Sequence, residues 1–149
     1  MNTDVHRIMA FDWGLRQIGV AVGNRLLGTS EPLTAVKARD GAADWAAIAV
    51  LIDTWQPGLL LVGEPLHMDG SDSPMAARAR KFSRQLHGRF GLPVVLADER
   101  LSSRAAKSDA LDRGHHGHWG STPIDAEAAN IILYSWLSEQ NRKLSDVDK

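Results

Sequence analysis

The sequence contains no cysteine, which excludes a disulfide framework and any chemistry that needs a thiol. It also lacks a long hydrophobic run, since no apolar stretch approaches the ~20 residues needed to span a bilayer. The first residues, MNTDVHR, have no apolar core of the kind that a signal peptide requires. Together these absences predict a cytoplasmic protein with no membrane partner.

A strong overall charge is absent as well, because the formal net charge is -1. A chain with this balance does not coat nucleic acid by charge alone. The local distribution differs, because no acidic residue occurs between Ser73 and Ala97. That stretch carries the basic residues Arg78, Arg80, Lys81, Arg84 and Arg89. These basic residues form a stripe that indicates either a surface that binds phosphates or an ordinary solvated helix face.

The length of 149 residues suits one domain, because a chain of this size buries roughly 70% of the surface that it exposes when unfolded. We expect a single domain over residues 1–149, with its core at about 7–138 and a polar tail at 139–149. Apolar patterning predicts strands at 7–13, 17–22, 26–36, 59–63 and 94–97. Helical spacing and capping residues predict helices at 45–55, 74–87, from 102 or 103 to 114, and 124–139.

This order of elements predicts an α/β fold built on a mixed five-stranded sheet. The first three strands follow one another closely enough to be antiparallel neighbours, whereas strands joined by helices must be parallel. We therefore expect helices on both faces and the first strand near the centre. In such sheets the ligand site lies beyond the carboxyl ends of the parallel strands.

Acidic residues gather at that predicted edge. Four of them follow strand ends, and a fifth opens the last helix: Asp12, Glu64, Asp98, Glu99 and Asp125. Singly, each is more often a turn residue, a cap or an arginine partner than a catalyst. Together in a crevice they would repel one another unless a cation neutralises them. Hard oxygen ligands without cysteine favour Mg²⁺ or Mn²⁺, and two such ions roughly 3.5–4 Å apart can promote phosphodiester hydrolysis.

Four segments in order resemble the YqgF family, also called RuvX. They are FDWG at 11–14, VGEPLHMDGS at 62–71, ADERLSS at 97–103 and IDAEAA at 124–129. The resemblance covers about Ile8 to Leu137, nearly the whole chain. It implies an RNase H-like fold and activity as a Holliday junction resolvase or in maturing the 5′ end of the 16S ribosomal RNA precursor.

The resemblance also implies roles at the matching positions. Asp12, Glu99 and Asp125 would be the catalytic, metal-binding acids, with Asp98 in support. Glu64 stands where the family usually has leucine, although the related RuvC resolvases carry a metal-binding glutamate at the corresponding strand end. It is either a fourth ligand or a solvent-facing substitution. Arg100 would orient Glu99 or contact a phosphate, unless it forms only a structural ion pair.

The sequence departs from the family pattern at two further places. Leu15 replaces a threonine, which removes a hydroxyl contact, and Pro123 stands where a basic residue commonly precedes the last acid. The loop before Pro123 holds His115, His116 and His118. These histidines either contact metal or phosphate or belong to a mobile polar loop. Trp119 either stacks on a base or pins that loop to the body.

We therefore expect a metal-dependent nuclease that uses Mg²⁺ or Mn²⁺ in 5′-end processing of the 16S rRNA precursor. Its partners would be nucleic acid and the ribosome precursor, and pre-rRNA is favoured over branched DNA as the nucleic acid. The protein would be a monomer or a homodimer. The predicted nucleic-acid contacts are Arg78, Arg80, Lys81, Arg84 and Arg100. The alternatives are a Holliday junction resolvase, a non-catalytic RNA-binding module, and a nucleotide-binding ATPase. The last alternative arises because the segment DWGLRQIGVAV resembles the phosphate-binding hairpin of such ATPases.

Overall fold

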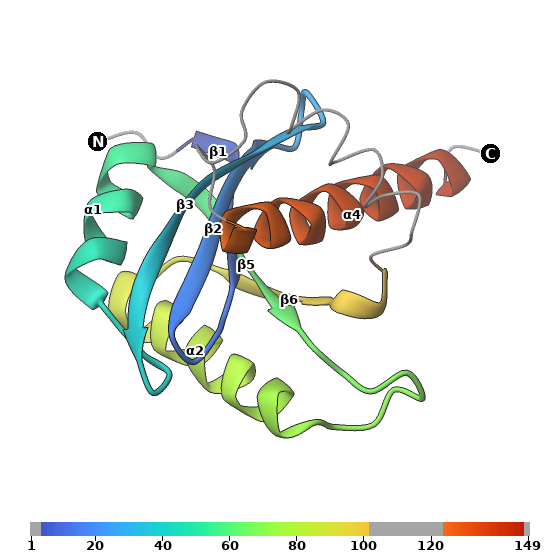
Figure 1. The fold of residues 1–149 in the computed structure, drawn as a ribbon. Coiled ribbons are helices and arrows are strands. Elements are labelled where there is room, and N and C mark those ends of the chain that lie inside the picture. The colour runs from blue at the N-terminus through green and yellow to red at the C-terminus, as the bar shows by residue number, and fades with distance from the viewer. Residues whose placement is uncertain (1–3, 102–123, 148–149) are drawn as a thin grey trace.

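A computed structural model describes residues 4–101 and 124–147 of the chain (Figure 1). Its sheet has six strands in the order β4-β3-β2-β1-β5-β6. The strands are β1 (Asp4–Asp12), β2 (Gln17–Asn24), β3 (Thr29–Arg39), β4 (Ala42–Ala43), β5 (Pro57–Glu64) and β6 (Val94–Asp98). β1 pairs antiparallel with β2 and parallel with β5, and β5 pairs parallel with β6. The expected mixed sheet with a central first strand is therefore confirmed.

The strand count differs from the expected five because β4 adds a short sixth strand. Its two residues pair antiparallel with Ala38 and Arg39 of β3. Asp40 and Gly41 between them both have positive φ, at 51° and 85°. An Asp-Gly pair is a strong hairpin signal, because both central residues of the favoured tight turn need positive φ. The signal was therefore present in the sequence.

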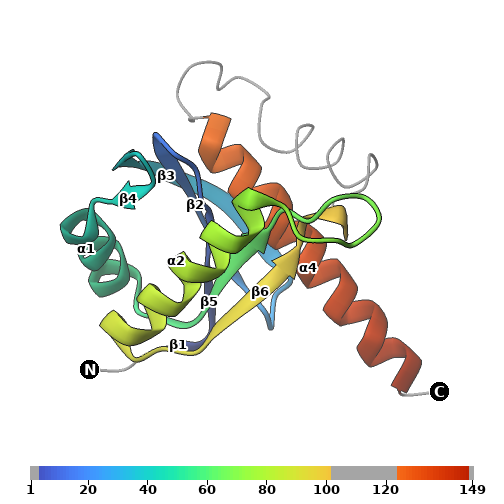
Figure 2. The same ribbon diagram turned by 90° about the horizontal axis from the view of Figure 1, so that it is seen from below.

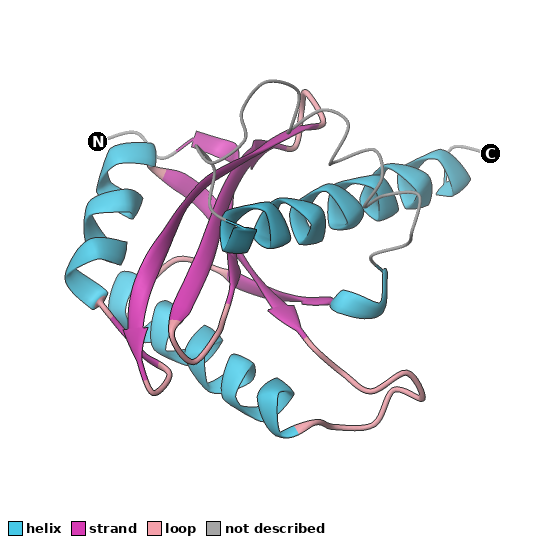
Figure 3. Ribbon diagram, in the orientation of Figure 1, coloured by secondary structure: helices cyan, strands magenta, loops and turns pink. Residues whose placement is uncertain are grey.

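Three long helices surround the sheet (Figure 3): α1 (Trp45–Trp55), α2 (Pro74–Phe90) and α4 (Ile124–Val147). A short 3-10 turn, η1 (Glu99–Leu101), follows β6. Asp44 and Ser73 cap the first two helices by accepting hydrogen bonds from the backbone three residues on. None of the described helices has both the length and the apolar character needed to cross a membrane.

The last helix continues to Val147 rather than ending near Glu139 as expected. The residues after Glu139 are mostly polar, but they include neither glycine nor proline before that end. Polarity alone does not stop a helix, so the predicted tail extends α4 instead. The predicted helix from Ser102 or Ser103, the three histidines and Trp119 lie outside the described residues.

Helices lie on both sides of the sheet (Figure 2), and the sheet separates two hydrophobic layers. α1 and α2 cover one face, where Met9, Phe11, Val20, Val62 and Phe82 are buried. α4 covers the other face, where Ile8, Ala10, Leu61, Ala97 and Leu133 are buried. Alternate residues of β1 thus enter opposite layers, as the two-residue period of a strand requires. This alternation decides where each carboxylate at the strand ends can point.

A glycine inside α2 offers a simple test of the packing. Nothing lies within 4 Å of the position that a Cβ on Gly88 would take. Gly88→Ala removes backbone freedom from the unfolded chain, so we expect it to stabilise the protein by about 0.5–1 kcal/mol in urea denaturation. Gly91, which ends α2 with φ of 69°, is the contrasting position. Gly91→Ala is expected to destabilise by about 1 kcal/mol, because a side chain disfavours positive φ. A destabilised Gly88→Ala protein would contradict the open surroundings.

Candidate active site

Asp12 ends the central strand on the face that α4 covers. Ala10, two residues earlier, is buried in the layer beneath α4. Side chains two residues apart on a strand point to the same face, so Asp12 follows Ala10 toward that helix. Asp12 is aligned with Gly19 of β2. The start of α4 lies directly over this glycine, because a Cβ on Gly19 would be 1.8 Å from the carbonyl oxygen of Asp125.

Asp125 stands in the first turn of α4 and acts electrostatically on Asp12. The pKa of Asp12 is raised from 3.8 to about 6, chiefly by burial and in addition by the charge of Asp125. Burial disfavours the charged carboxylate, and a second negative charge nearby adds repulsion. The chain thus brings together two acids that the sequence places more than a hundred residues apart.

Glu99 lies on the same face, beside β5. A Cβ added to Gly63 would be 3.2 Å from both Cγ and Cδ of Glu99 and 2.8 Å from Cδ1 of Ile132. Ile132 belongs to α4, so Glu99 occupies the space between the end of β5 and that helix. Glycine at position 63 leaves this space open. Asp12 and Glu99 therefore lie on the face of the sheet that α4 covers, and Asp125 lies at the start of that helix.

The donor chemistry of these acids suits a hard divalent cation. Carboxylate oxygens are the ligands that Mg²⁺ and Mn²⁺ prefer, and a cation would remove the repulsion between Asp12 and Asp125. Within residues 4–101 and 124–147, no three acidic or histidine side chains stand close enough to enclose an ion already. Asp12 and Asp125 form the pair, and Glu99 is the nearby third acid on their face.

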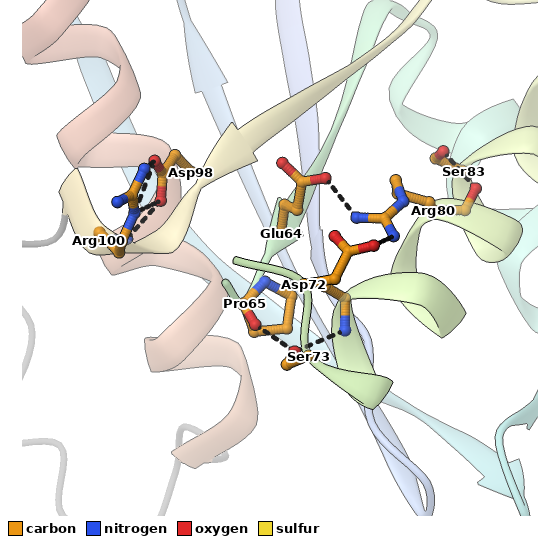
Figure 4. Close-up of polar contacts among 9 residues, drawn as sticks. Glu64, Pro65, Asp72, Ser73, Arg80, Ser83, Asp98 and Arg100 are labelled. Atoms are coloured by element: carbon orange, nitrogen blue, oxygen red, sulfur yellow. Dashed lines mark hydrogen bonds and ion pairs between the residues drawn. The ribbon is translucent and has the colours of Figure 1, made fainter. Parts of the chain in front are cut away.

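Glu64 points to the opposite face. Val62, two residues earlier, is buried in the layer beneath α1 and α2. The carboxylate of Glu64 accepts a hydrogen bond from Nη1 of Arg80 at 2.9 Å (Figure 4). Nη2 of the same arginine donates to Asp72, also at 2.9 Å. Arg80, predicted to meet nucleic acid, therefore holds two carboxylates, and Glu64 lies apart from the acids beneath α4.

Asp98 and Arg100 form a second local pair (Figure 4). Nη2 of Arg100 donates to Oδ2 of Asp98 at 2.6 Å, and the Arg100 backbone donates to the same carboxylate at 2.9 Å. These hydrogen bonds lower the pKa of Asp98. Nη1 of Arg100 also donates to the carbonyl of Met68 at 3.3 Å. The pair ties the end of β6 to the loop after β5, which is the ion-pair alternative considered for Arg100.

The remaining predicted basic contacts lie along α2. Arg78 stacks over Trp13, with 5.0 Å from its guanidinium carbon to the ring centroid, and donates to the carbonyl of Asp40 at 2.8 Å. Lys81 and Arg84 are exposed and form no ion pair with the described residues. Arg78 and Lys81 also line a hollow of about 280 Å³ between α2 and the β3–β4 turn. On α2, Lys81 and Arg84 are therefore the predicted cations that remain open to a ligand.

A second hollow, of about 530 Å³, lies beside Asp125, and the five other residues that line it were not predicted as site residues. Its lining residues are Gly14, Leu15, Arg16, Gln17, Met75 and Asp125. They come from the β1–β2 turn, the start of α2 and the start of α4. One sequence signal was available, because the turn directly follows Asp12. A turn at the carboxyl end of the central strand necessarily borders the site.

The position of Glu64 gives a direct prediction. Because Glu64 faces Arg80 rather than the acids beneath α4, Glu64→Gln is expected to keep nuclease activity within about threefold of wild type. The lost ion pair is partly exposed and should cost no more than about 1 kcal/mol of stability. Cleavage rates and urea denaturation measure the two effects. A loss of activity of 100-fold or more with the fold intact would instead make Glu64 a metal ligand.

The chain is similar in sequence to known proteins over most of its length. Residues 6–139 match the family described as "RuvX: Holliday junction resolvase". A Chromohalobacter salexigens protein named "Putative pre-16S rRNA nuclease" is 53% identical over 132 residues, which cover 89% of each chain. A Yersinia pestis protein of the same name is 50% identical over 133 residues, covering 89% of this chain and 95% of that one.

Solved structures show the same fold at much lower identity. RuvC from T. thermophilus in complex with a Holliday junction substrate matches with a TM-score of 0.62 and 15% identity. The match covers 91% of this chain and 95% of that one. A second Thermus thermophilus RuvC structure matches with a TM-score of 0.51 and 12% identity, covering 89% and 96% of the two chains. The RNase H-like fold expected from the motifs is confirmed.

Proposed function

Because this chain belongs to the RuvX family and is a nuclease, we propose that it uses Mg²⁺ or Mn²⁺ to cut RNA at the 5′ end of the 16S rRNA precursor. The observation that carries the metal dependence is the Asp12–Asp125 pair. Burial and mutual repulsion raise the pKa of Asp12 to about 6, as expected for acids arranged to receive a cation.

Asp12, Asp125 and Glu99 are the residues that would hold the ion. When bound, a divalent ion lowers the pKa of a water molecule and stabilises the oxygen that leaves the cut phosphodiester. The protein holds the acids in place: Asp12 on a central strand, and Asp125 at the start of a helix packed on Gly19. Rigid placement matters because a displacement of about 1 Å is enough to lose much of the rate.

The cations of α2 are suited to hold the nucleic-acid backbone. Lys81 and Arg84 are exposed, and Arg78, stacked over Trp13, lines the hollow together with Lys81. Contacts to phosphates position a nucleic acid without reading its sequence. Replacing Lys81 and Arg84 together with alanine should therefore weaken binding and flatten its salt dependence. Arg80 and Arg100 are occupied by carboxylates, so their contribution to binding would be indirect.

The choice of an RNA substrate rests on the relatives at 50–53% identity, whose printed names specify the 16S rRNA precursor. The family description, which specifies the Holliday junction, supports branched DNA as a second candidate. The fold serves either substrate, because the same carboxylates can act on RNA and DNA. We place the protein in the cytoplasm, where the ribosome precursor would be its partner.

The experiment offers both substrates to the purified protein in Mn²⁺ and in Mg²⁺. One is a labelled RNA carrying the 5′ precursor end of 16S rRNA, and the other is a four-way DNA junction. We expect cleavage of the RNA that EDTA abolishes. Asp12→Asn is the control, since cleavage that persists in this variant comes from another nuclease. Junction cleavage without RNA cleavage would overturn the RNA assignment in favour of the second candidate.

A further inference from the structure

The hollow beside Asp125 has a chemical character that the acids alone do not explain. Leu15 and Met75 line it as large apolar side chains, exposed at 40% and 36%. Arg16 and Gln17 line it from the same turn. An acidic site that bound only a metal ion would need none of these groups. Apolar surface, a cation and an amide around one hollow match the parts of a nucleotide.

Arg16 is the cation of this hollow. Its side chain is exposed and makes no ion pair with any described residue. Arg78, Arg80 and Arg100 differ, because each already binds a carbonyl or a carboxylate of the protein. A guanidinium that has no partner among the described residues can offer its planar fork to a phosphate.

The backbone around Arg16 is held in place. The amide of Ala38 donates to the carbonyl of Arg16 at 2.8 Å, and the amide of Gly41 donates to the carbonyl of Leu15 at 2.9 Å. Gly14 closes the turn, since a Cβ there would lie 2.6 Å from the carbonyl oxygen of Gln17. A turn fixed at both carbonyls presents Arg16 from a constant position. Less conformational freedom is then lost when a ligand binds.

We propose that this hollow is the subsite for the nucleotide next to the bond that is cut, with Arg16 binding its phosphate. Leu15 and Met75 form apolar walls for the sugar and base, and Asp125 marks the side toward the reacting phosphate. The inference rests on the nuclease function proposed above. It adds a phosphate contact from the β1–β2 turn, an element separate from the basic stripe of α2.

The test measures binding of a fluorescent single-stranded RNA by anisotropy, with all variants made in the Asp12→Asn background so that no cleavage occurs. Arg16→Gln is expected to weaken binding about tenfold at 0.1 M salt, as the loss of a charge-assisted contact predicts. The slope of log affinity against log salt should fall by about 0.7, the value for one phosphate contact on a single strand. Arg16→Lys should keep the slope and lose only part of the affinity.

Two controls separate the subsite from general charge effects. Lys143→Gln removes an exposed positive charge near the far end of α4 and should change neither affinity nor slope. Leu15→Asn should weaken binding with the slope unchanged, because it alters only an apolar wall.

The outcomes distinguish this inference from the proposed function. If Arg16→Gln binds like Lys143→Gln, the subsite is wrong even where the wild type cleaves RNA. If Arg16 governs binding but the wild type cleaves no RNA, the subsite stands and the RNA nuclease assignment falls. If the Asp12→Asn protein does not bind the RNA at all, the subsite is wrong as well.

Discussion

Asp12→Asn is expected to abolish cleavage and at the same time to stabilise the fold. Removing a metal-ligand carboxylate should lower the cleavage rate by about 100-fold or more, since even residues that merely support metal ligands contribute 10- to 100-fold. The gain in stability follows from the raised pKa, because the native protein at neutral pH buries a charged Asp12 and places it beside Asp125. The asparagine removes that repulsion while it keeps the shape of the side chain.

The sign of the pH dependence can be worked out from the two pKa values. Folding raises the pKa of Asp12 from 3.8 to about 6, so between these values the folded chain binds more protons than the unfolded chain. Stability contributed by this group is therefore present at low pH and is lost as pH rises toward about 6. The difference corresponds to about 3 kcal/mol at pH 7, which is the upper limit of the gain expected for Asp12→Asn.

Urea denaturation in EDTA measures this effect at pH 7 and at about pH 4, where the gain should largely disappear. Asp53→Asn is the matched control, since Asp53 is exposed on α1 and its replacement should change stability by less than about 0.5 kcal/mol. An Asp12→Asn protein less stable than wild type at pH 7 would show that the carboxylate is held by favourable partners, and the acid pair would then be wrong.

Gly19→Ala should have the second largest effect, through the backbone of α4. The added Cβ would lie 1.8 Å from the carbonyl oxygen and 2.4 Å from the carbonyl carbon of Asp125. No side chain can rotate away to relieve this clash, so the start of α4 must move. We expect a loss of about 3 kcal/mol or more in stability. We also expect cleavage to fall by about 100-fold, because Asp125 moves away from Asp12.

Gly63→Ala keeps this prediction testable if the Gly19 variant does not fold. Its Cβ would meet the end of the Ile132 side chain at 2.8 Å and the Glu99 side chain at 3.2 Å, and both can shift. We therefore expect a clear loss of cleavage activity with only a small loss of stability. Gly88→Ala, with open space around it, is the control for a glycine replacement as such. A folded Gly19→Ala protein with normal cleavage would remove the start of α4 from the site.

Much of the fold could be predicted because its signals are local. The caps Asp44 and Ser73, and the continuous apolar run of β5, depend on neighbours in the sequence. The structure differs from the expectation at the β4 hairpin, which has a turn signal at Asp40 and Gly41, and at the end of α4. The length of a helix depends on packing and on the absence of breakers, which polarity does not report.

The site was predicted less completely because it depends on which face each side chain meets. The sequence places Glu64 and Asp98 at strand ends as clearly as Asp12, yet Arg80 and Arg100 occupy them. Partners that come from a different helix or loop are visible only after folding. The same holds for Arg16, whose relevance comes from the hollow it shares with Asp125 rather than from a motif.

Calorimetric titration of Mn²⁺ into the wild-type protein and into Asp12→Asn tests the central claim most directly, because it requires no knowledge of the substrate. If Asp12 and Asp125 together receive the ion, the wild type binds Mn²⁺ and the variant binds it at least about tenfold more weakly. Below about pH 6, binding to the wild type should also release a proton from Asp12. Equal Mn²⁺ affinity in the two proteins would contradict the account.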